Sequence, residues 1–362
     1  MDPLNPFGVY FNLMKIRYAT YSDALSSLNF LNPTDKVNVF INLETALTYL
    51  STTKDLEKKL VVNRNFAEYM KVDIINIAAH YKDFFKGNGL ETKVFIYMTD
   101  LNSDSDDFKE SKYTEDFRSY YLNKYTTNPK FALLGDRLID DILPDVRTLC
   151  EYIPDVYFIT GKNIDDGMIP YIIGKANPDW KNIVISGDLH DTQYSYEENF
   201  LDCFYNRSYA RGSLGFGPKD FLKAISKSDE VPEELVTLFA NASFYSSLLS
   251  VLGDRYRSIP NIKGIGFKTL VKSIVDGMKE KKINNETRSA MLLASIFPPD
   301  VQGSLYNNLL VTDVQNEFDM LTDGDRKTIL SQIIDRSDIT ALQQLNRTRF
   351  RNNQLRLEGL LK

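Results

Sequence analysis

Four short runs of apolar residues alternate with longer amphipathic stretches along the first two thirds of the chain. The apolar runs, rich in Val, Ile, Phe and Tyr, are residues 37–43, 93–99, 156–159 and 182–186. Runs of this length and composition are typical of buried strands. Helical periodicity covers residues 66–85 and 131–152, and one face of the second stretch carries Leu133, Leu134, Leu138, Ile142, Val146 and Leu149. The alternation predicts an α/β fold, with a mostly parallel sheet and helices on both of its faces.

Acidic residues follow three of the four predicted strands. Asp100 comes directly after the second run, Asp165 and Asp166 come after the third, and Asp188 comes after the fourth. In a parallel sheet the carboxyl ends of the strands meet at one edge, where ligands bind. We therefore expect Asp100, Asp166 and Asp188 to converge at that edge.

A second candidate site is the segment 259–269, IPNIKGIGFKT, which places two glycines one residue apart before a predicted helix. Gly264 and Gly266 permit a tight turn whose backbone N–H groups face a phosphate, while Ile262 and Ile265 anchor the loop. The predicted DNA-binding residues are Lys263, Gly264, Gly266, Lys268, Thr269 and Lys272. The alternative is a purely structural helical hairpin.

The distribution of charge favours the DNA-binding interpretation. The whole chain has a net charge of -6, but residues 255–282 hold eight basic and only two acidic residues, a local charge of about +6. Neutralisation of phosphates by Lys and Arg supplies most of the non-specific affinity for nucleic acid. We expect one basic face on an acidic protein; the alternative is a solvated helical face.

Length and composition predict a soluble protein with a large core. The chain has 362 residues and 43% hydrophobic content, and it lacks both a signal-peptide pattern and an apolar run of the ~20 residues that cross a bilayer. We expect a cytoplasmic location, in the host cell if a phage encodes the protein, and no membrane partner. Cys150 and Cys203 have no metal-type spacing and are expected to be buried thiols. The expected domains are an N-terminal extension (1–36), an α/β core (37–244) with an insertion (101–130), and a helical region (245–362).

The order of these motifs resembles that of the 5′ nucleases, the family of flap endonucleases and phage ribonuclease H-like 5′–3′ exonucleases with a PIN-like fold. In that family an acid ends each of the first two strands, a Glu-x-Asp-Asp cluster opens a helix, and a Gly-Asp-x-Asp run follows strand four. A Gly-Asp-x-x-Asp run then precedes an Ile-Pro-Gly hairpin within a helix-hairpin-helix. The resemblance spans about residues 37 to 318, and the segment 305–311, LYNNLLV, resembles the family's segment after the hairpin.

Four acids of the family pattern are replaced in this chain. The first strand's acid falls on Asn42, the second on Asp100, and the cluster on residues 163–166, with Asn163 in place of Glu. The Gly-Asp-x-Asp run falls on residues 187–190 and ends in His190, and the Gly-Asp-x-x-Asp run falls on residues 253–257 and ends in Arg257. Asp100, Asp165, Asp166 and Asp188 remain as the catalytic set.

The resemblance implies a pair of magnesium ions, or manganese, that would activate water and stabilise the leaving oxygen. Asp100, Asp166 and Asp188 would be the metal ligands. Hard cations need anionic oxygens, so the four replacements predict an impaired metal site. Glu44 and His190 are candidate substitute ligands, the latter for manganese or zinc. In related enzymes the hairpin also holds a monovalent cation, and the resemblance implies one here.

The insertion after Asp100 corresponds to the family's helical arch, which guides a 5′ single strand. Here acidic residues outnumber basic ones in its first part, and this composition disfavours threading of a strand. Three functions remain open. They are a catalytically impaired DNA-binding protein of phage or viral DNA metabolism or of a larger assembly, an active 5′ nuclease with a variant metal site, and a structural or interaction protein. The expected partners are duplex or branched DNA, and a protein of a replication, transcription or virion assembly.

Overall fold

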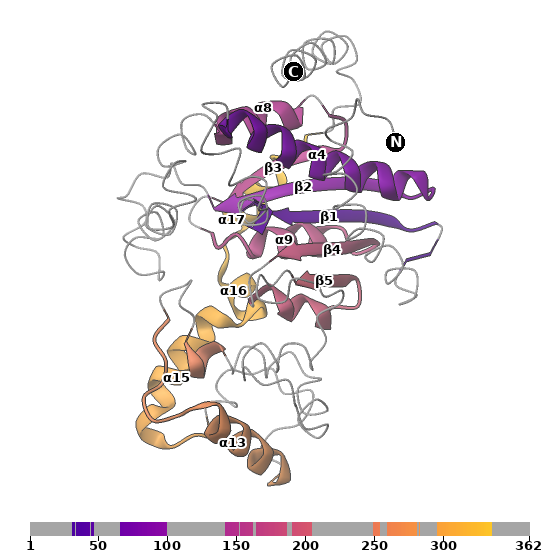
Figure 1. Ribbon diagram of the computed structural model, residues 1–362. Helices are drawn as coiled ribbons and strands as arrows, with labels where there is room; N and C mark the ends of the chain where they lie inside the picture. Colours follow the sequence, from indigo (N-terminus) through magenta and orange to yellow (C-terminus); the bar gives the residue numbers. More distant parts are fainter. Residues whose placement is uncertain are drawn as a thin grey trace, which may run out of the picture. The chain divides into compact units, whose positions relative to one another are not determined.

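The computed structural model describes just under half of the chain (Figure 1). The described residues are 31–32, 34–43, 45–46, 66–99, 142–151, 153–161, 164–186, 190–204, 249–253, 259–280, 282 and 295–334. They form two compact units. Unit 1 comprises Met1–Lys36, Asn177–Asp254 and Ile259–Glu317, and unit 2 comprises Val37–Ala176, Arg255–Ser258 and Phe318–Lys362. Among the described residues, no helix combines the length and apolarity needed to cross a membrane.

Unit 2 contains three consecutive strands of the sheet in the order β3-β2-β1. They are β1 (Lys36–Asn42), β2 (Glu91–Thr99) and β3 (Val156–Gly161). β2 and β3 are parallel, with Val94 opposite Val156 and Thr99 opposite Gly161. The strands are buried almost throughout because both faces are covered, which explains their continuous apolar sequences.

An aromatic row crosses these three strands. Phe40 of β1 stacks on Phe95 of β2 with ring centroids 5.0 Å apart, and Phe95 stacks on Tyr157 of β3 at 5.1 Å. All three side chains are buried. Cross-strand aromatic pairs of this kind stabilise the register of neighbouring strands. The row therefore helps to place the carboxyl ends of the strands at one edge.

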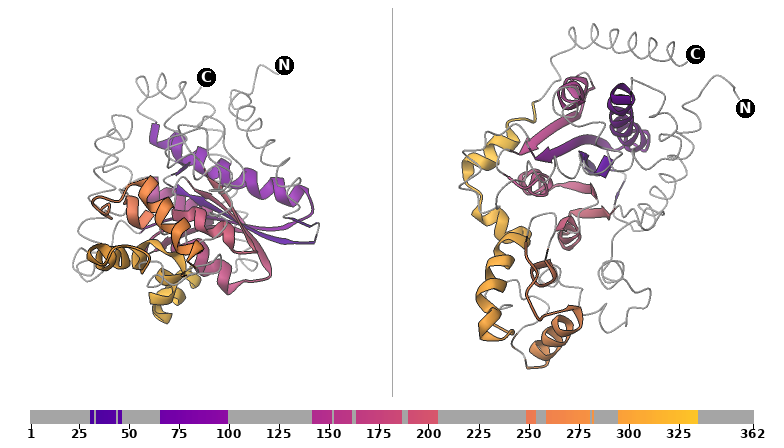
Figure 2. Two further views of the ribbon diagram at one scale, coloured as in Figure 1. Left: turned by 90° about the horizontal axis from the view of Figure 1, so that it is seen from below. Right: turned by 60° about the vertical axis from the view of Figure 1, so that its left-hand side comes forward.

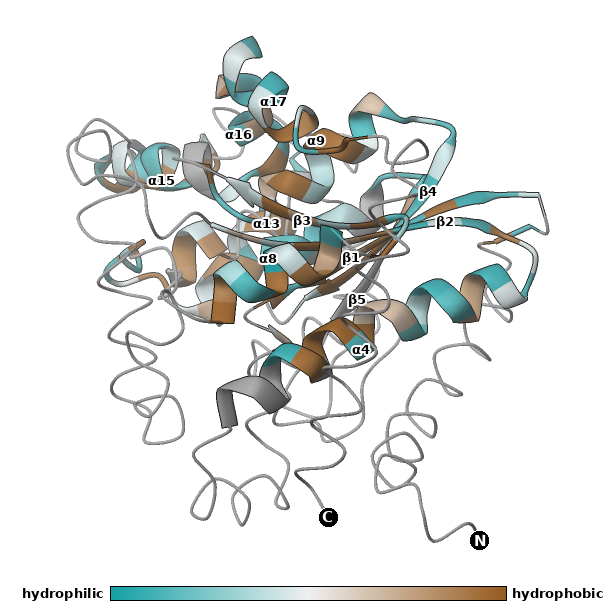
Figure 3. Cartoon of the chain, turned by 90° about the horizontal axis from the view of Figure 1, so that it is seen from above, coloured by the Kyte–Doolittle hydropathy of each residue, from teal (hydrophilic) through white to brown (hydrophobic). Residues whose placement is uncertain are grey.

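Helices cover both faces of these strands, as the sequence predicts. They are α4 (Phe66–Gly87), α8 (Leu143–Glu151), α9 (Met168–Ala176) and α17 (Asp323–Leu330). Figure 3 shows α4 and α8 on one face and α9 and α17 on the other. α8 buries Leu143, Val146 and Cys150, and Cys150 is a free thiol as expected.

Unit 1 contains two parallel strands and the helical elements that follow them. β4 (Trp180–Ser186) pairs with β5 (Phe200–Phe204), with Asn182 opposite Phe200, and the 3-10 helix η2 (His190–Tyr196) connects them. The helices are α13 (Phe267–Lys279), α15 (Pro299–Thr312) and α16 (Val314–Met320), the last of which continues into unit 2 after Glu317. The sequence analysis missed β5, which is only five residues long and carries Asp202 at its centre.

Candidate functional site

The carboxyl end of β1 is tied to the turn before α9 by a buried hydrogen bond. Asn42, the last residue of β1, donates from its side-chain Nδ2 to Oδ2 of Asp166 at 2.9 Å. Its Oδ1 accepts from the backbone N–H of Thr45 at 3.0 Å and lies 3.3 Å from the Thr45 hydroxyl. Asn42 and Asp166 are each 4% exposed. Both the nitrogen and the oxygen of the Asn42 amide thus form hydrogen bonds within the protein.

Asp165 and Asp166 occupy the tight turn between β3 and α9. Oδ1 of Asp165 accepts from the Gly167 N–H at 2.9 Å. The backbone carbonyls of Asp165 and Asp166 accept from Met168 and Ile169, the first residues of α9, at 2.9 and 3.1 Å. These bonds satisfy N–H groups at the start of a helix, which have no partner within the helix itself. The turn therefore places both aspartates at the start of α9, and it holds the Asp165 carboxylate through the Gly167 N–H.

Gly161 permits the close approach that this turn requires. A Cβ at Gly161 would lie 3.2 Å from the carbonyl oxygen of Ile164 and 3.3 Å from its Cβ. Those distances are shorter than ordinary van der Waals contacts. A side chain at this end of β3 would consequently push residues 164–167 away from the strand.

Gln332 also holds the carboxyl end of β3 in place. Its Oε1 accepts from the Thr160 N–H at 3.0 Å, and its Nε2 donates to the Thr160 carbonyl at 2.9 Å. Arg147 of α8 donates to the Thr160 hydroxyl at 3.1 Å. Sequence reasoning missed this residue because 172 positions separate the partners and no motif marks them.

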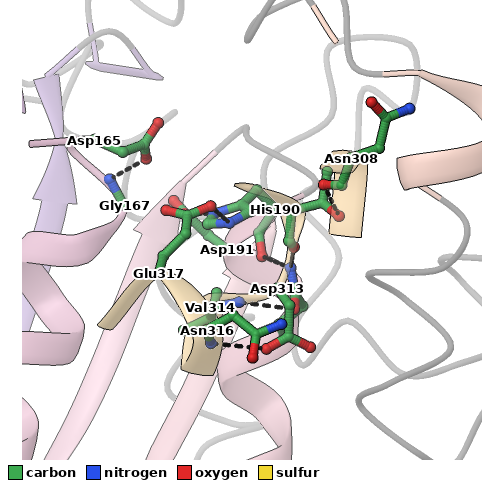
Figure 4. A network of polar contacts seen from close by, with 11 residues as sticks. Asp165, Gly167, His190, Asp191, Asn308, Asp313, Val314, Asn316 and Glu317 are labelled. Carbon is green, nitrogen blue, oxygen red and sulfur yellow. Dashed lines mark hydrogen bonds and ion pairs between the residues drawn. The ribbon is translucent and has the colours of Figure 1, made fainter. Parts of the chain in front are cut away.

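In unit 1, His190 forms a buried pair with Glu317 (Figure 4). His190 Nε2 lies 3.1 Å from Glu317 Oε1, and His190 Nδ1 lies 3.7 Å from Asp191 Oδ1. The exposed fractions of His190, Asp191 and Glu317 are 0%, 0% and 2%. His190 begins η2, so the alternation of a strand does not apply to Asp191, which is buried beside it. Sequence reasoning did not single out Glu317.

A second set of hydrogen bonds surrounds this pair. Gln193 donates from Nε2 to the Thr312 carbonyl at 2.7 Å, and its Oε1 accepts from the Val314 N–H at 3.3 Å. Asp313 caps the start of α16 by accepting from the Asn316 N–H at 3.0 Å. These contacts fix η2 to the junction of α15 and α16, and with it the two partners His190 and Glu317.

The glycine-rich segment forms a tight turn before α13. Ile262 and Ile265 are buried, and the Ile262 N–H donates to the Val251 carbonyl at 2.8 Å. Gly264 has a φ of 84°, and a Cβ there would contact nothing within 4 Å. Gly253 has a φ of 80°, and a Cβ there would lie 2.8 Å from the backbone at Ile259 and Asn261. The two arms of the turn are residues 249–253 and 259–262. Gly253 allows these arms to approach each other closely, while Gly264 faces open space.

The predicted DNA-binding side chains all point to solvent. Lys263, Lys268, Thr269 and Lys272 are exposed, as is Lys279 at the end of α13. Gly266 is exposed as well, directly before the first residue of the helix. Lys282 differs from these lysines, because it forms an ion pair of 2.7 Å with Glu280. We call the exposed residues 263, 264, 266, 268, 269 and 272 the hairpin face.

Asn308 of α15 holds the base of this turn. Its Nδ2 donates to the carbonyl of Ser250 at 2.7 Å and to that of Pro260 at 3.0 Å, so one amide joins both arms. Asn308 is 8% exposed. In Figure 2 the turn at residues 259–266 leads directly into α13, and α15 belongs to the same unit.

The described part of the predicted metal site does not fit a divalent cation. Asn42 presents an N–H donor to Asp166 where a cation needs an oxygen, and Nε2 of His190 is taken up by Glu317. Among the described residues, no three His, Cys, Asp or Glu side chains are grouped as a metal site. Glu44, Asp100, Asn163, Asp188 and Arg257 lie outside the described residues, as does the insertion at 101–130.

Comparison with known proteins finds similarity to solved structures. No protein-family model matches the chain, and no curated protein matches it. The structure is similar to that of a bacteriophage T5 flap endonuclease in a pseudo-enzyme–product complex with DNA and metal ions, at 15% identity and a TM-score of 0.48 over 82% of this chain and 98% of that one. It is also similar to the T5 5′-exonuclease with bound zinc, at 14% identity and a TM-score of 0.48 over 81% and 98%. Similarity at this level assigns no activity to the chain.

Proposed function

We propose that this chain is a DNA-binding protein on a 5′ nuclease scaffold whose phosphodiester-cleaving site is impaired. The observation that carries the proposal is the hairpin face, where lysines surround a glycine turn at the start of a long helix. Lys263, Lys268 and Lys272 are exposed there, and none of them has a described ion-pair partner. Such a surface suits the phosphate backbone of duplex DNA and reads no base sequence.

The turn itself supports the same proposal. Gly264 leaves its surroundings open, so a phosphate can approach the backbone of the turn closely. Buried Ile262 and Ile265 and the Asn308 amide hold the turn rigid beneath that surface. A rigid surface loses little conformational entropy when it binds. The hairpin face is thus preorganised for a phosphate backbone.

Impairment of the catalytic site is supported by the hydrogen bonds of Asn42 and His190. Each occupies a position where the resemblance implies a metal-side acid, and each is joined to a protein carboxylate. A chain that keeps a DNA-binding surface and has an impaired cleavage site suits a role in holding branched or duplex DNA. We place that role in phage or viral DNA metabolism, alone or as a subunit of a larger assembly.

A salt titration of duplex binding tests this proposal. If lysines neutralise phosphates, the logarithm of the binding constant falls with the logarithm of salt concentration by about 0.9 per phosphate contact. We expect a slope of about -3 or steeper for the three lysines of the hairpin face. A flat response would instead support a protein-interaction role, in which this surface docks an acidic partner.

A further inference from the structure

We propose that the hydrogen bond between Asn42 and Asp166 takes the place of a divalent cation in linking the end of β1 to the turn before α9. The inference rests on the proposed function only in taking the 5′ nuclease scaffold as its starting point. It predicts that the folded protein is indifferent to divalent cations, and that one substitution makes it depend on them.

The orientation of the Asn42 amide follows from its partners. The backbone N–H of Thr45 can only donate, so it requires the Asn42 oxygen, at 3.0 Å. The nitrogen is thereby turned to Asp166, whose carboxylate accepts at 2.9 Å. A flipped amide would place oxygen against carboxylate and N–H against N–H. The observed arrangement gives the amide oxygen a donor and the amide nitrogen an acceptor.

Electrostatics explains why an amide suits this position. Two aspartates here would put two negative charges within hydrogen-bonding distance in a region that is 4% exposed. Buried like charges repel strongly unless a proton or a cation lies between them. Asn42 removes one of the charges and supplies the donor that joins the groups. The contact that would need a cation becomes an ordinary charge-assisted hydrogen bond.

Unit 1 contains a second contact of the same kind. His190 stands where the resemblance implies an acid, and its Nε2 lies 3.1 Å from Glu317 Oε1. A nitrogen again meets a carboxylate directly, at a fully buried site. The two contacts lie in different units and involve different side chains, so a nitrogen at the position of an implied acid meets a carboxylate twice among the described residues.

Thermal unfolding with EDTA, and with millimolar MgCl₂ or MnCl₂, tests the inference without any DNA. The wild-type Tm should be the same in all three solutions. Asn42→Asp should unfold several degrees lower in EDTA, and MnCl₂ should restore most of the loss. Asn88→Asp, an exposed site in the same unit, makes the same charge change and should show no cation response.

Exchange of the two groups gives a second, independent variant. Asn42→Asp combined with Asp166→Asn keeps one donor and one carboxylate, so it should fold without cation and show a Tm that does not change with MnCl₂. If Asn42→Asp fails to fold in every solution, this exchange variant decides: a folded, cation-indifferent protein supports the inference, and an unfolded one contradicts it. A wild-type Tm that rises with MnCl₂ would overturn the inference, while duplex binding by the hairpin face would be unaffected.

Discussion

Gln332 pairs with the backbone of Thr160 as a neighbouring strand would, accepting from its N–H at 3.0 Å and donating to its carbonyl at 2.9 Å. β3 is the last strand on its side of the sheet, so this contact satisfies an edge that otherwise invites pairing with another chain. It also fixes the strand that leads into Asp165 and Asp166. Gln332 therefore supports the candidate site by fixing the strand that precedes it.

Removal of the Gln332 amide should destabilise the protein. Gln332→Ala leaves both backbone groups of Thr160 without this partner, and we expect a loss of about 1–3 kcal/mol in the free energy of unfolding. Urea unfolding measures it. Lys327→Ala, at an exposed position of α17, is the control and should change stability by less than about 0.5 kcal/mol. An equal effect of the two substitutions would contradict the edge-capping role.

Charge reversal on the hairpin face should abolish duplex binding. Lys263→Glu with Lys268→Glu removes two phosphate contacts and adds two charges that repel the DNA backbone. Lys86→Glu with Lys327→Glu is the matched control, because it makes the same charge change at two exposed lysines of unit 2. Binding by fluorescence anisotropy and folding by circular dichroism check the result. Equal loss in both double variants would show that net charge, and not the hairpin, governs binding.

Asn308 should affect affinity without changing the salt slope. Asn308→Ala removes the donor shared by the Ser250 and Pro260 carbonyls, which loosens the turn but leaves every lysine in place. We expect weaker duplex binding, an unchanged slope and a stability loss of about 1–3 kcal/mol. The neighbouring Asn307 is exposed, so Asn307→Ala should alter none of the three. A normal affinity for Asn308→Ala would show that the amide does not position the turn.

Lys82 should give the stability of unit 2 a distinct pH dependence. Burial lowers the pKa of Lys82 below its ordinary value of 10.5, and Asp155, 3.4 Å away, offsets this only in part. Between the lowered pKa and 10.5 the unfolded chain binds more protons than the folded one, so stability rises with pH there. Lys82→Met removes this titration. The unfolding free energy of the wild type minus that of the variant should therefore increase as pH approaches 10.5; a decrease would contradict the assignment.

The sequence predicted the strands well where burial is continuous. β1, β2, β3 and β4 are runs of apolar, largely β-branched or aromatic residues, which is the pattern of buried strands. β5 was missed because Asp202 interrupts a run of only five residues. Pairing with β4 makes this short segment a strand, and pairing is not a local property of the sequence.

Side-chain partners in the candidate site were harder to predict. Asn42 and Asp166 lie 124 positions apart, and His190 and Glu317 lie 127 apart. The sequence indicated that Asn42 ends one strand and that Asp166 follows another, but the atom that meets the carboxylate depends on the Thr45 turn. Glu317 carries no motif at all. What distinguishes Glu317 is its burial in an otherwise polar helix. That burial results from tertiary packing, which the local sequence does not reveal.

The most direct test of the account uses a labelled duplex with a 5′ flap, incubated with the protein in MgCl₂ and then in MnCl₂. Native electrophoresis reports binding, and denaturing electrophoresis reports cleavage of the same sample. The account predicts a DNA complex with the strands intact in both cations. Cleavage that appears with either cation and disappears in Asp188→Ala would contradict it and identify an active 5′ nuclease.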